Sequence, residues 1–191
     1  MKDVVALGEL LIDFAPVSTD DAGYPTLKAQ PGGAPGNFLA ALQQYGCTTA
    51  LIGKVGDDAF GHLLKGTLDT LGIGTGGIVT DPSVFTTLAF VTLDATGNRS
   101  FSFARKPGAD TCLRSEEIDY KLLDDCKVFH FGTLSLTNDP ARSATQAAVS
   151  YAKKQGKRIS FDPNLRKPLW PDDATAKEQM EWGLHQADIV K

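Results

Sequence analysis

The order of apolar and polar segments predicts an α/β fold with a parallel main sheet and a second, smaller β-sheet. Short apolar runs alternate with amphipathic segments of helical period through most of the chain, which is typical of strands joined by helices. A glycine-rich turn at 30–37 leads directly into one of these helices. Two β-rich segments, at about 14–30 and 86–107, break the alternation, and we expect them to form the smaller sheet.

The first predicted strand is the apolar run from Val4 to Leu7, continued through Ile12. Such a run is typical of a strand buried on both faces of a parallel sheet. Asp13 follows at its carboxyl end, which is where open α/β sheets bind ligands. Its carboxylate is a candidate for holding a ligand hydroxyl or a cation. The alternative is a loop aspartate or a helix cap.

The glycine-rich turn, Gln30–Asn37, holds three glycines and two prolines in eight residues. That composition cannot continue a helix or a central strand, and the amphipathic run that follows ends at Gly46. The turn leaves free N–H groups at the positive end of a helix, where Gly32 and Gly33 let a ligand approach the main chain. Asn37 adds a donor and acceptors. The alternative is a capped helix that binds nothing.

The remaining elements are predicted from the same two apolar periods. Thr86–Leu93 and Arg99–Ala104 form a hairpin with its turn at 94–98. Phe103 and Arg105 end this hairpin, and they either cover a polar ligand or are simply solvated. Elsewhere we predict helices at 34–45, 58–71, 115–124, 140–156 and 171–186, and strands at 48–52, 78–79, 128–131, 157–161 and 188–191.

Two local patterns that could suggest other chemistry lie in the wrong context. Gly72–Gly77 matches G-x-G-x-x-G, but a dinucleotide fingerprint follows a strand and opens a helix, whereas this one follows a helix. We interpret it as a helix end and loop. His130 lies inside a predicted strand and Ser135 follows without a G-x-S-x-G elbow, so we interpret the histidine as a core residue.

Composition narrows the class of protein. The 191 residues carry a net charge of -4 and show no basic footprint, so we expect no nucleic-acid partner. Cys47, Cys112 and Cys126 form no C-x-x-C pair and no zinc pattern, and predict free thiols in the cytoplasm. The N-terminus lacks a secretory apolar region and no apolar run could span a bilayer, so we expect no membrane partner.

Two motifs taken together resemble the first signature of the ribokinase (pfkB) family of carbohydrate kinases. These are Gly32–Asn37 and, after the next predicted strand, Gly53–Gly61. Gly8–Asp13 and Phe161–Trp170 are similar to the fructokinase branch, and the resemblance covers all of 1–191. It implies the N-terminal part of a ribokinase-like α/β/α sandwich, Rossmann-like, whose β-sheet lid is inserted at about 14–30 and 86–107.

The resemblance also implies a function and roles for single residues. The function is an ATP-dependent sugar kinase that uses Mg²⁺ and converts D-fructose to fructose 6-phosphate. A homodimer formed through the lid is a further expectation. The residues that would hold the sugar hydroxyls are Asp13, Gly32, Gly33 and Asn37. Phe103 and Arg105 would come from the lid. Asn164 and Arg166 would reach toward the region of the transferred phosphate.

The family's second signature, of the form Asp-Thr-x-Gly-Ala-Gly-Asp with the catalytic aspartate, has no match up to Lys191. The metal-linked N-x-x-E motif is also absent, so no catalytic base and no metal ligand is assigned in this chain. We expect either a piece of a longer kinase or a truncated relative. A non-catalytic sugar-binding module stays open, as does a nicotinamide-dependent oxidoreductase that would rest on Gly72–Gly77.

Overall fold

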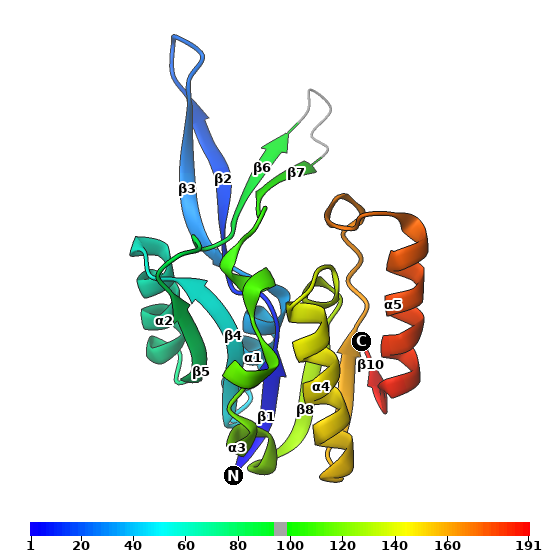
Figure 1. Ribbon diagram of the computed structural model, residues 1–191. Helices are drawn as coiled ribbons and strands as arrows, with labels where there is room; N and C mark the ends of the chain where they lie inside the picture. Colours follow the sequence, from blue (N-terminus) through cyan, green and yellow to red (C-terminus); the bar gives the residue numbers. More distant parts are fainter. Residues whose placement is uncertain (94–98) are drawn as a thin grey trace.

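The structure is a computed structural model that describes residues 1–93 and 99–191. The turn predicted at 94–98 lies outside these residues. A six-stranded main sheet forms the body of the molecule, and a four-stranded sheet rises from one end of it (Figure 1). All neighbouring strands of the main sheet run parallel. In spatial order they are β10 (Ile189–Val190), β9 (Arg158–Asp162), β8 (Cys126–Gly132), β1 (Lys2–Leu7), β4 (Thr49–Gly56) and β5 (Gly74–Asp81).

Helices cover both faces of the main sheet, as the α/β/α prediction requires. Successive side chains of a strand point to opposite faces, and so Val5 and Leu7 enter one apolar core while Val4 and Ala6 enter the other. Both cores are closed by apolar helix faces. The first core packs against α3 (Tyr120–Asp124), α4 (Ala141–Lys154) and α5 (Asp173–Gln186), and the second against α1 (Ala34–Gln44) and α2 (Ala59–Thr70).

The strand order reverses at β1. From there the chain moves outward through β4 and β5, then returns to the other side of β1 and continues through β8, β9 and β10. In open α/β sheets a crevice forms at such a reversal, outside the carboxyl ends of the strands. The sheet topology therefore indicates a ligand site beyond the ends of β1 and β8.

The smaller sheet, which we call the lid, consists of the two predicted irregular segments. Its strands are ordered β3 (Pro25–Gly32), β2 (Leu11–Thr19), β6 (Leu88–Leu93) and β7 (Arg99–Ala104), with β2 parallel to β6 and the other two pairs antiparallel. Aromatic contacts fix its base to the body. Phe14 stacks on Phe90 with ring centroids 5.2 Å apart and meets the edge of Phe60 on α2 at 5.6 Å.

The prediction of one strand from Val4 to Ile12 is wrong. The strand ends at Leu7, and β2 begins at Leu11 in the other sheet. Gly8 stands at the crossing because a Cβ there would lie 2.6 Å from Cγ of Pro35. Asp13 consequently belongs to the lid and does not sit at the carboxyl end of a main-sheet strand.

Three further boundaries differ from the sequence-based expectation. β4 continues to Gly56, because its second half pairs with β5. β5 starts at Gly74, before the predicted 78–79, although Gly72 ends α2 with a φ of 76° as expected. The helix predicted at 115–124 is broken by Ile118, whose extended backbone lets it enter the core. What remains is a 3₁₀ turn, Ser115–Glu117, followed by α3; the other 3₁₀ turns are Ala109–Cys112, Leu134–Leu136 and Lys167–Leu169.

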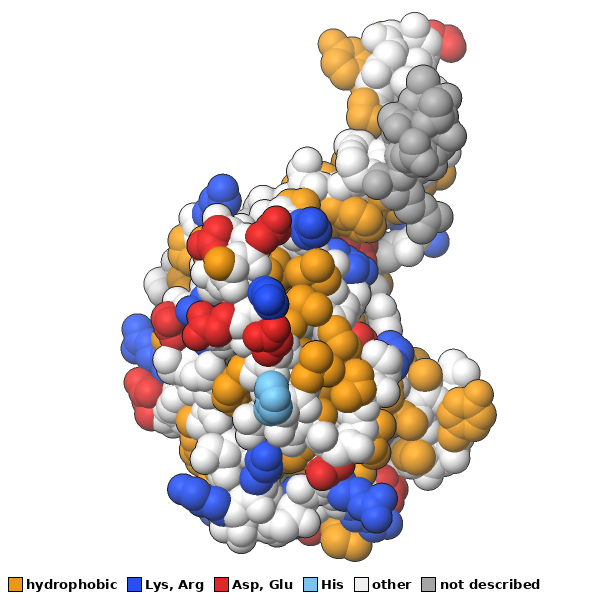
Figure 2. All heavy atoms as spheres, turned by 90° about the vertical axis from the view of Figure 1, so that its right-hand side faces the viewer, with side chains coloured by type: hydrophobic (Ala, Val, Ile, Leu, Met, Phe, Trp, Pro, Cys, Tyr) orange, Lys and Arg blue, Asp and Glu red, His pale blue; other side chains and the backbone are white. Residues whose placement is uncertain are grey.

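The outer side of α5 exposes apolar surface. Figure 2 shows hydrophobic side chains gathered along the side of the molecule where α5 lies. A groove there is lined in part by Leu165, Ala176, Met180 and Leu184. Contiguous apolar surface of this kind is uncommon on isolated domains. Within the described residues, none of the helices combines the length and apolar character that crossing a bilayer requires.

Candidate functional site

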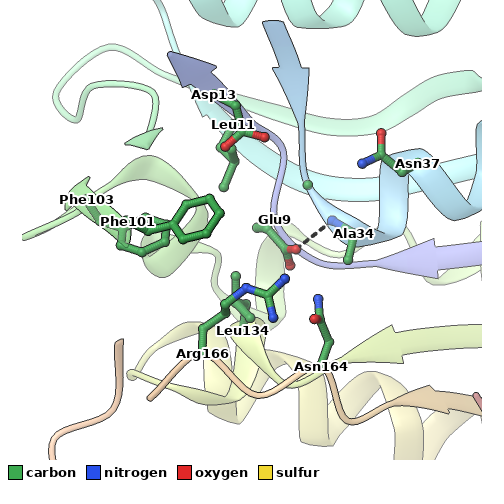
Figure 3. Close-up of a pocket in the computed structure, with 11 residues that line it drawn as sticks. Glu9, Leu11, Asp13, Ala34, Asn37, Phe101, Phe103, Leu134, Asn164 and Arg166 are labelled. Carbon is green, nitrogen blue, oxygen red and sulfur yellow. Dashed lines mark hydrogen bonds between the residues drawn. The ribbon is translucent and has the colours of Figure 1, made fainter. Parts of the chain in front are cut away.

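A pocket of about 200 Å³ lies where the main sheet meets the lid. It is placed at the reversal of strand order, and its walls come from the ends of β1, β8 and β9, the first turn of α1, and the lid strands β2 and β7 (Figure 3). The pocket therefore has one wall from the body and one from the lid. The residues that line it are Glu9, Leu11, Asp13, Gly33, Ala34, Asn37, Phe101, Phe103, Leu134, Asn164 and Arg166.

The glycine turn is shaped by close approaches of the chain. Gly33, the N-cap of α1, has a φ of 113°, and a Cβ on it would collide with the carbonyl oxygen of Glu9. Gly32 does not line the pocket, but the Asp13 carboxylate occupies the space where its Cβ would be. Gly33 is therefore required for the shape of the site, whereas a side chain at Gly32 would displace the Asp13 carboxylate. Asn37 lies in the first turn of α1 on the pocket wall.

Glu9 is a pocket residue that the sequence analysis missed. Gly33 carries no side chain to cap α1, and the carboxylate of Glu9 takes that place: its Oε1 accepts the N–H of Ala34 at 2.8 Å. Glu9 is only 3% exposed, and burial raises its pKa to about 7, against the effect of that hydrogen bond. The available signal was a charged residue between the apolar runs Val4–Leu7 and Leu10–Ile12, because a glutamate is seldom fully buried without a partner.

Asp13 and Arg166 come to the pocket from opposite walls (Figure 3). Asp13 is on β2 of the lid, whereas Arg166 is in the segment that follows β9. Burial raises the pKa of Asp13, and the positive charge of Arg166 partly opposes that rise. The pocket thus contains a carboxylate and a guanidinium that attract each other at long range.

The segment carrying Asn164 and Arg166 is held in place by the end of β8. The hydroxyl of Thr133 donates to the carbonyl oxygens of Pro163 at 3.0 Å and Asn164 at 3.3 Å. The N–H of Asn164 donates to Asp162 Oδ1 at 3.2 Å. These bonds leave the side chains of Asn164 and Arg166 free to line the pocket, where the sequence analysis expected them.

Arg105 is not brought to the pocket. Its guanidinium is buried, with Nη2 at 2.6 Å from Oδ2 of Asp110 and Nε at 2.8 Å from the same oxygen. Nη1 donates to the Thr137 hydroxyl and Nη2 also donates to the carbonyl of Leu134. Four donor contacts are thus made within the protein, and the arrangement joins the end of β7 to the segment after β8.

Two phenylalanines from β7 form the lid side of the pocket. Phe103 was expected there, and Phe101, two residues earlier on the same strand face, was not. Their rings lie 6.2 Å apart and nearly parallel, with an interplanar angle of 17°. They give the pocket an apolar wall opposite its polar one.

His130 is a core histidine, as expected. Its Nδ1 lies 3.0 Å from the hydroxyl of Ser160, and its ring centroid is 4.1 Å from that of Phe38. Burial lowers its pKa to about 4, so the imidazole is neutral at pH 7. Within residues 1–93 and 99–191, no three His, Cys, Asp or Glu side chains come together as a metal-binding group.

Comparison with known proteins agrees with this architecture. The model of the pfkB family carbohydrate kinases matches residues 1–191. The chain belongs to the pfkB family. Among the family's curated members, "Probable fructokinase-2" of Arabidopsis thaliana is 45% identical over 193 residues, which cover 98% of this chain and 58% of the relative.

Solved structures of similar proteins show the same fold. Fructokinase from Xylella fastidiosa with bound ATP superposes with a TM-score of 0.91 at 34% identity, over 100% of this chain and 57% of that one. A fructokinase double mutant from Vibrio cholerae, bound to fructose, ADP and potassium ion, gives a TM-score of 0.85 at 30% identity, over 99% of this chain and 59% of that one. This chain therefore spans a little under three fifths of the length of these relatives.

Proposed function

We propose that the intact protein is an ATP-dependent sugar kinase acting on D-fructose, and that this chain supplies its sugar-binding pocket. The observation that carries the proposal is the pocket between the body and the lid, which combines a carboxylate, an amide and a guanidinium with an aromatic cover. The names of the fructokinase relatives, and the fructose bound to the Vibrio cholerae protein, support the choice of sugar.

In this proposal the polar wall holds the sugar and the lid excludes water. The Asp13 carboxylate accepts hydrogen bonds from sugar hydroxyls, and the Asn37 amide both accepts and donates them. Hydrogen bonds to the charged acceptor are the stronger ones. Phe101 and Phe103 cover the apolar face of the ring. Exclusion of water matters for a kinase, because water competes with the sugar hydroxyl for the phosphoryl group.

Asn164 and Arg166 are proposed to face the phosphate region. Phosphoryl transfer requires positioning of the reactants and positive charge near the transferred group, and the Arg166 guanidinium provides such a charge at the edge of the pocket. ATP is the proposed phosphoryl donor, in line with the ATP bound to the Xylella fastidiosa protein. Because the described residues assemble no metal-binding group, we assign the proposed Mg²⁺ no ligand in this chain.

The test is a coupled ADP-release assay on the intact protein with ATP, magnesium and D-fructose, repeated with ribose and a nucleoside. We expect turnover that is fastest with fructose and is lost in Asp13→Ala. We expect none from the 191-residue chain alone, because it contains no match to the family's catalytic signature. Fructose binding without ADP release by the intact protein would instead favour a non-catalytic sugar-binding module.

We also propose that two copies associate through their lids. The distal lid exposes large apolar side chains, among them Tyr24 at 71% and Val17 at 63% exposure. Sedimentation analysis should show a dimer that dissociates in a Val17→Asp, Tyr24→Asp double variant. Tyr45→Asp, at a still more exposed tyrosine at the end of α1, is the control and should leave the dimer intact.

A cytoplasmic location belongs to the same proposal. It is supported by the absence of disulfide pairing among Cys47, Cys112 and Cys126, which stand as free thiols. Fractionation of the source cells, followed by detection of the protein with an antibody, tests it directly.

A further inference from the structure

Glu9 lies at the junction of the three parts that build the pocket. It follows β1 of the main sheet and precedes β2 of the lid, and its carboxylate bonds the N-terminus of α1 through the Ala34 N–H. The same side chain lines the pocket (Figure 3). A single carboxylate therefore contacts the glycine turn and also faces the space in which a ligand would sit.

Few groups of the protein stabilise the ionised form of the Glu9 carboxylate. Backbone N–H groups of Ala34 and of Glu9 itself favour it, while burial opposes it more strongly. Of the charged groups near it, Arg105 favours the ionised form and Asp110 disfavours it, and the two largely cancel because they are paired with each other.

The pocket side contributes one more charge of each sign. Asp13 and Arg166 line the same pocket, from the lid and from the segment after β9. The charge of Arg166 acts on Asp13, whereas the charged groups that act on Glu9 are Arg105 and Asp110. A buried carboxylate with few donors gains most from a hydroxyl that arrives with a ligand.

We propose that Glu9 is a sugar-binding residue, which holds the N-terminus of α1 with one carboxylate oxygen and accepts a hydroxyl of the bound sugar with the other. This inference rests on the proposed sugar-kinase function. The hydroxyl proton stays on the sugar oxygen, and the proton that leaves is the one carried by Glu9 in the empty pocket, which passes to solvent. Sugar binding is therefore coupled to proton release.

The size of this coupling follows from the acidity of the empty site. With a pKa of about 7, Glu9 is mostly protonated at pH 6 and mostly ionised at pH 8. If only the ionised form accepts the hydroxyl, fructose affinity rises about tenfold between these pH values, and about half a proton is released per sugar bound at pH 7.

The experiment is calorimetric titration of the intact protein with D-fructose at pH 6, 7 and 8, in phosphate and in Tris. These buffers differ in their heat of ionisation, and the difference in apparent heat counts the protons released. Glu9→Gln keeps an oxygen for the Ala34 N–H but cannot titrate, so its binding should be independent of pH and release no proton. Glu181→Gln, at an exposed glutamate on α5, should behave as the wild type does.

The outcomes separate the two proposals. Wild-type protein that binds fructose without releasing protons, or a Glu9→Gln variant that still releases them, overturns the role of Glu9 and leaves the sugar kinase standing. A wild-type protein that binds no fructose at any pH overturns the proposed substrate, and the role of Glu9 with it. If the Glu9→Gln variant fails to fold, the proton release measured with the wild-type protein still tests the role of Glu9.

Discussion

The body and the lid contribute to one pocket but are stabilised in different ways. Every residue of β4 in the body is buried, whereas most of β3 in the lid is exposed. The base of the lid packs into the second apolar core of the body through Ile12, Phe14 and Leu88, and the Arg105–Asp110 pair joins it to the segment after β8. Substitutions in the body wall should therefore change stability, and substitutions in the lid wall should mainly change ligand binding.

Two pairs of opposite charges also differ in whether they stabilise the fold or face the pocket. Arg105 and Asp110 are in direct contact, fully buried and supplied with further hydrogen bonds. Asp13 and Arg166 face each other only across the pocket, and their remaining hydrogen-bonding capacity is open to a ligand. The first pair joins the lid to the body, and the second is available for binding.

The largest effect is expected from removing one member of the buried pair. Asp110→Ala leaves the Arg105 guanidinium buried without its partner, which should lower the free energy of unfolding by about 3–5 kcal/mol. Urea denaturation of the intact protein measures it. Glu181→Ala, which removes the exposed partner of Lys177 on α5, should cost less than about 1 kcal/mol. Equal losses in the two variants would contradict the distinction.

The ionisation of Glu9, in the body wall of the pocket, should lower the free energy of unfolding as the pH rises. Its folded-state pKa is about 7, above the ordinary 4.5, so the folded state binds more protons between these values and stability falls as pH increases through that window. The full penalty above pH 7 is about 3 kcal/mol. Comparing unfolding of the wild type and Glu9→Gln at pH 5 and pH 8 isolates it.

That comparison also removes a contribution of opposite sign from His130. The folded-state pKa of His130 is about 4, below the ordinary 6.5, so the folded protein loses stability as the pH falls through this range. Both proteins contain His130, and its effect cancels in their difference. A difference that stays constant from pH 5 to pH 8 would show that Glu9 does not titrate in this range.

A smaller effect, confined to binding, is expected from the lid carboxylate. Asp13→Ala should weaken fructose binding by about 1.5–3 kcal/mol, because a charge-assisted hydrogen bond is lost. The free energy of unfolding of this variant should be unchanged or slightly higher, since burial already disfavours the charged form of Asp13. Calorimetry and urea unfolding of the same preparation give both numbers, and unchanged affinity would remove Asp13 from the site.

The smallest effect is expected from the aromatic cover. Phe101 is 39% exposed, so Phe101→Ala should cost only about 1 kcal/mol of sugar affinity and leave unfolding unchanged. Phe85→Ala, at an exposed phenylalanine outside the pocket, is the matched control and should leave affinity unchanged. Equal affinity in the two variants would mean that the lid does not cover the sugar.

Much of this molecule could be predicted from local patterns. Apolar period and turn residues were enough for the parallel sheet, the two lid segments, the glycine turn before α1 and the core position of His130. The resemblance to carbohydrate kinases supplied Asn164, Arg166 and Phe103, which the structure brings to the pocket. These features depend on residues close together in the chain or on motifs of fixed length.

What the sequence alone did not determine depends on contacts between distant segments. The chain leaves the main sheet at Gly8 because Pro35 of α1 occupies the space beside it, and no local pattern records that contact. Arg105 turns away from the pocket because Asp110 and Thr137 meet it there. Glu9 reaches the pocket because the strand order reverses beside it, and only the assembled sheet shows where that reversal lies.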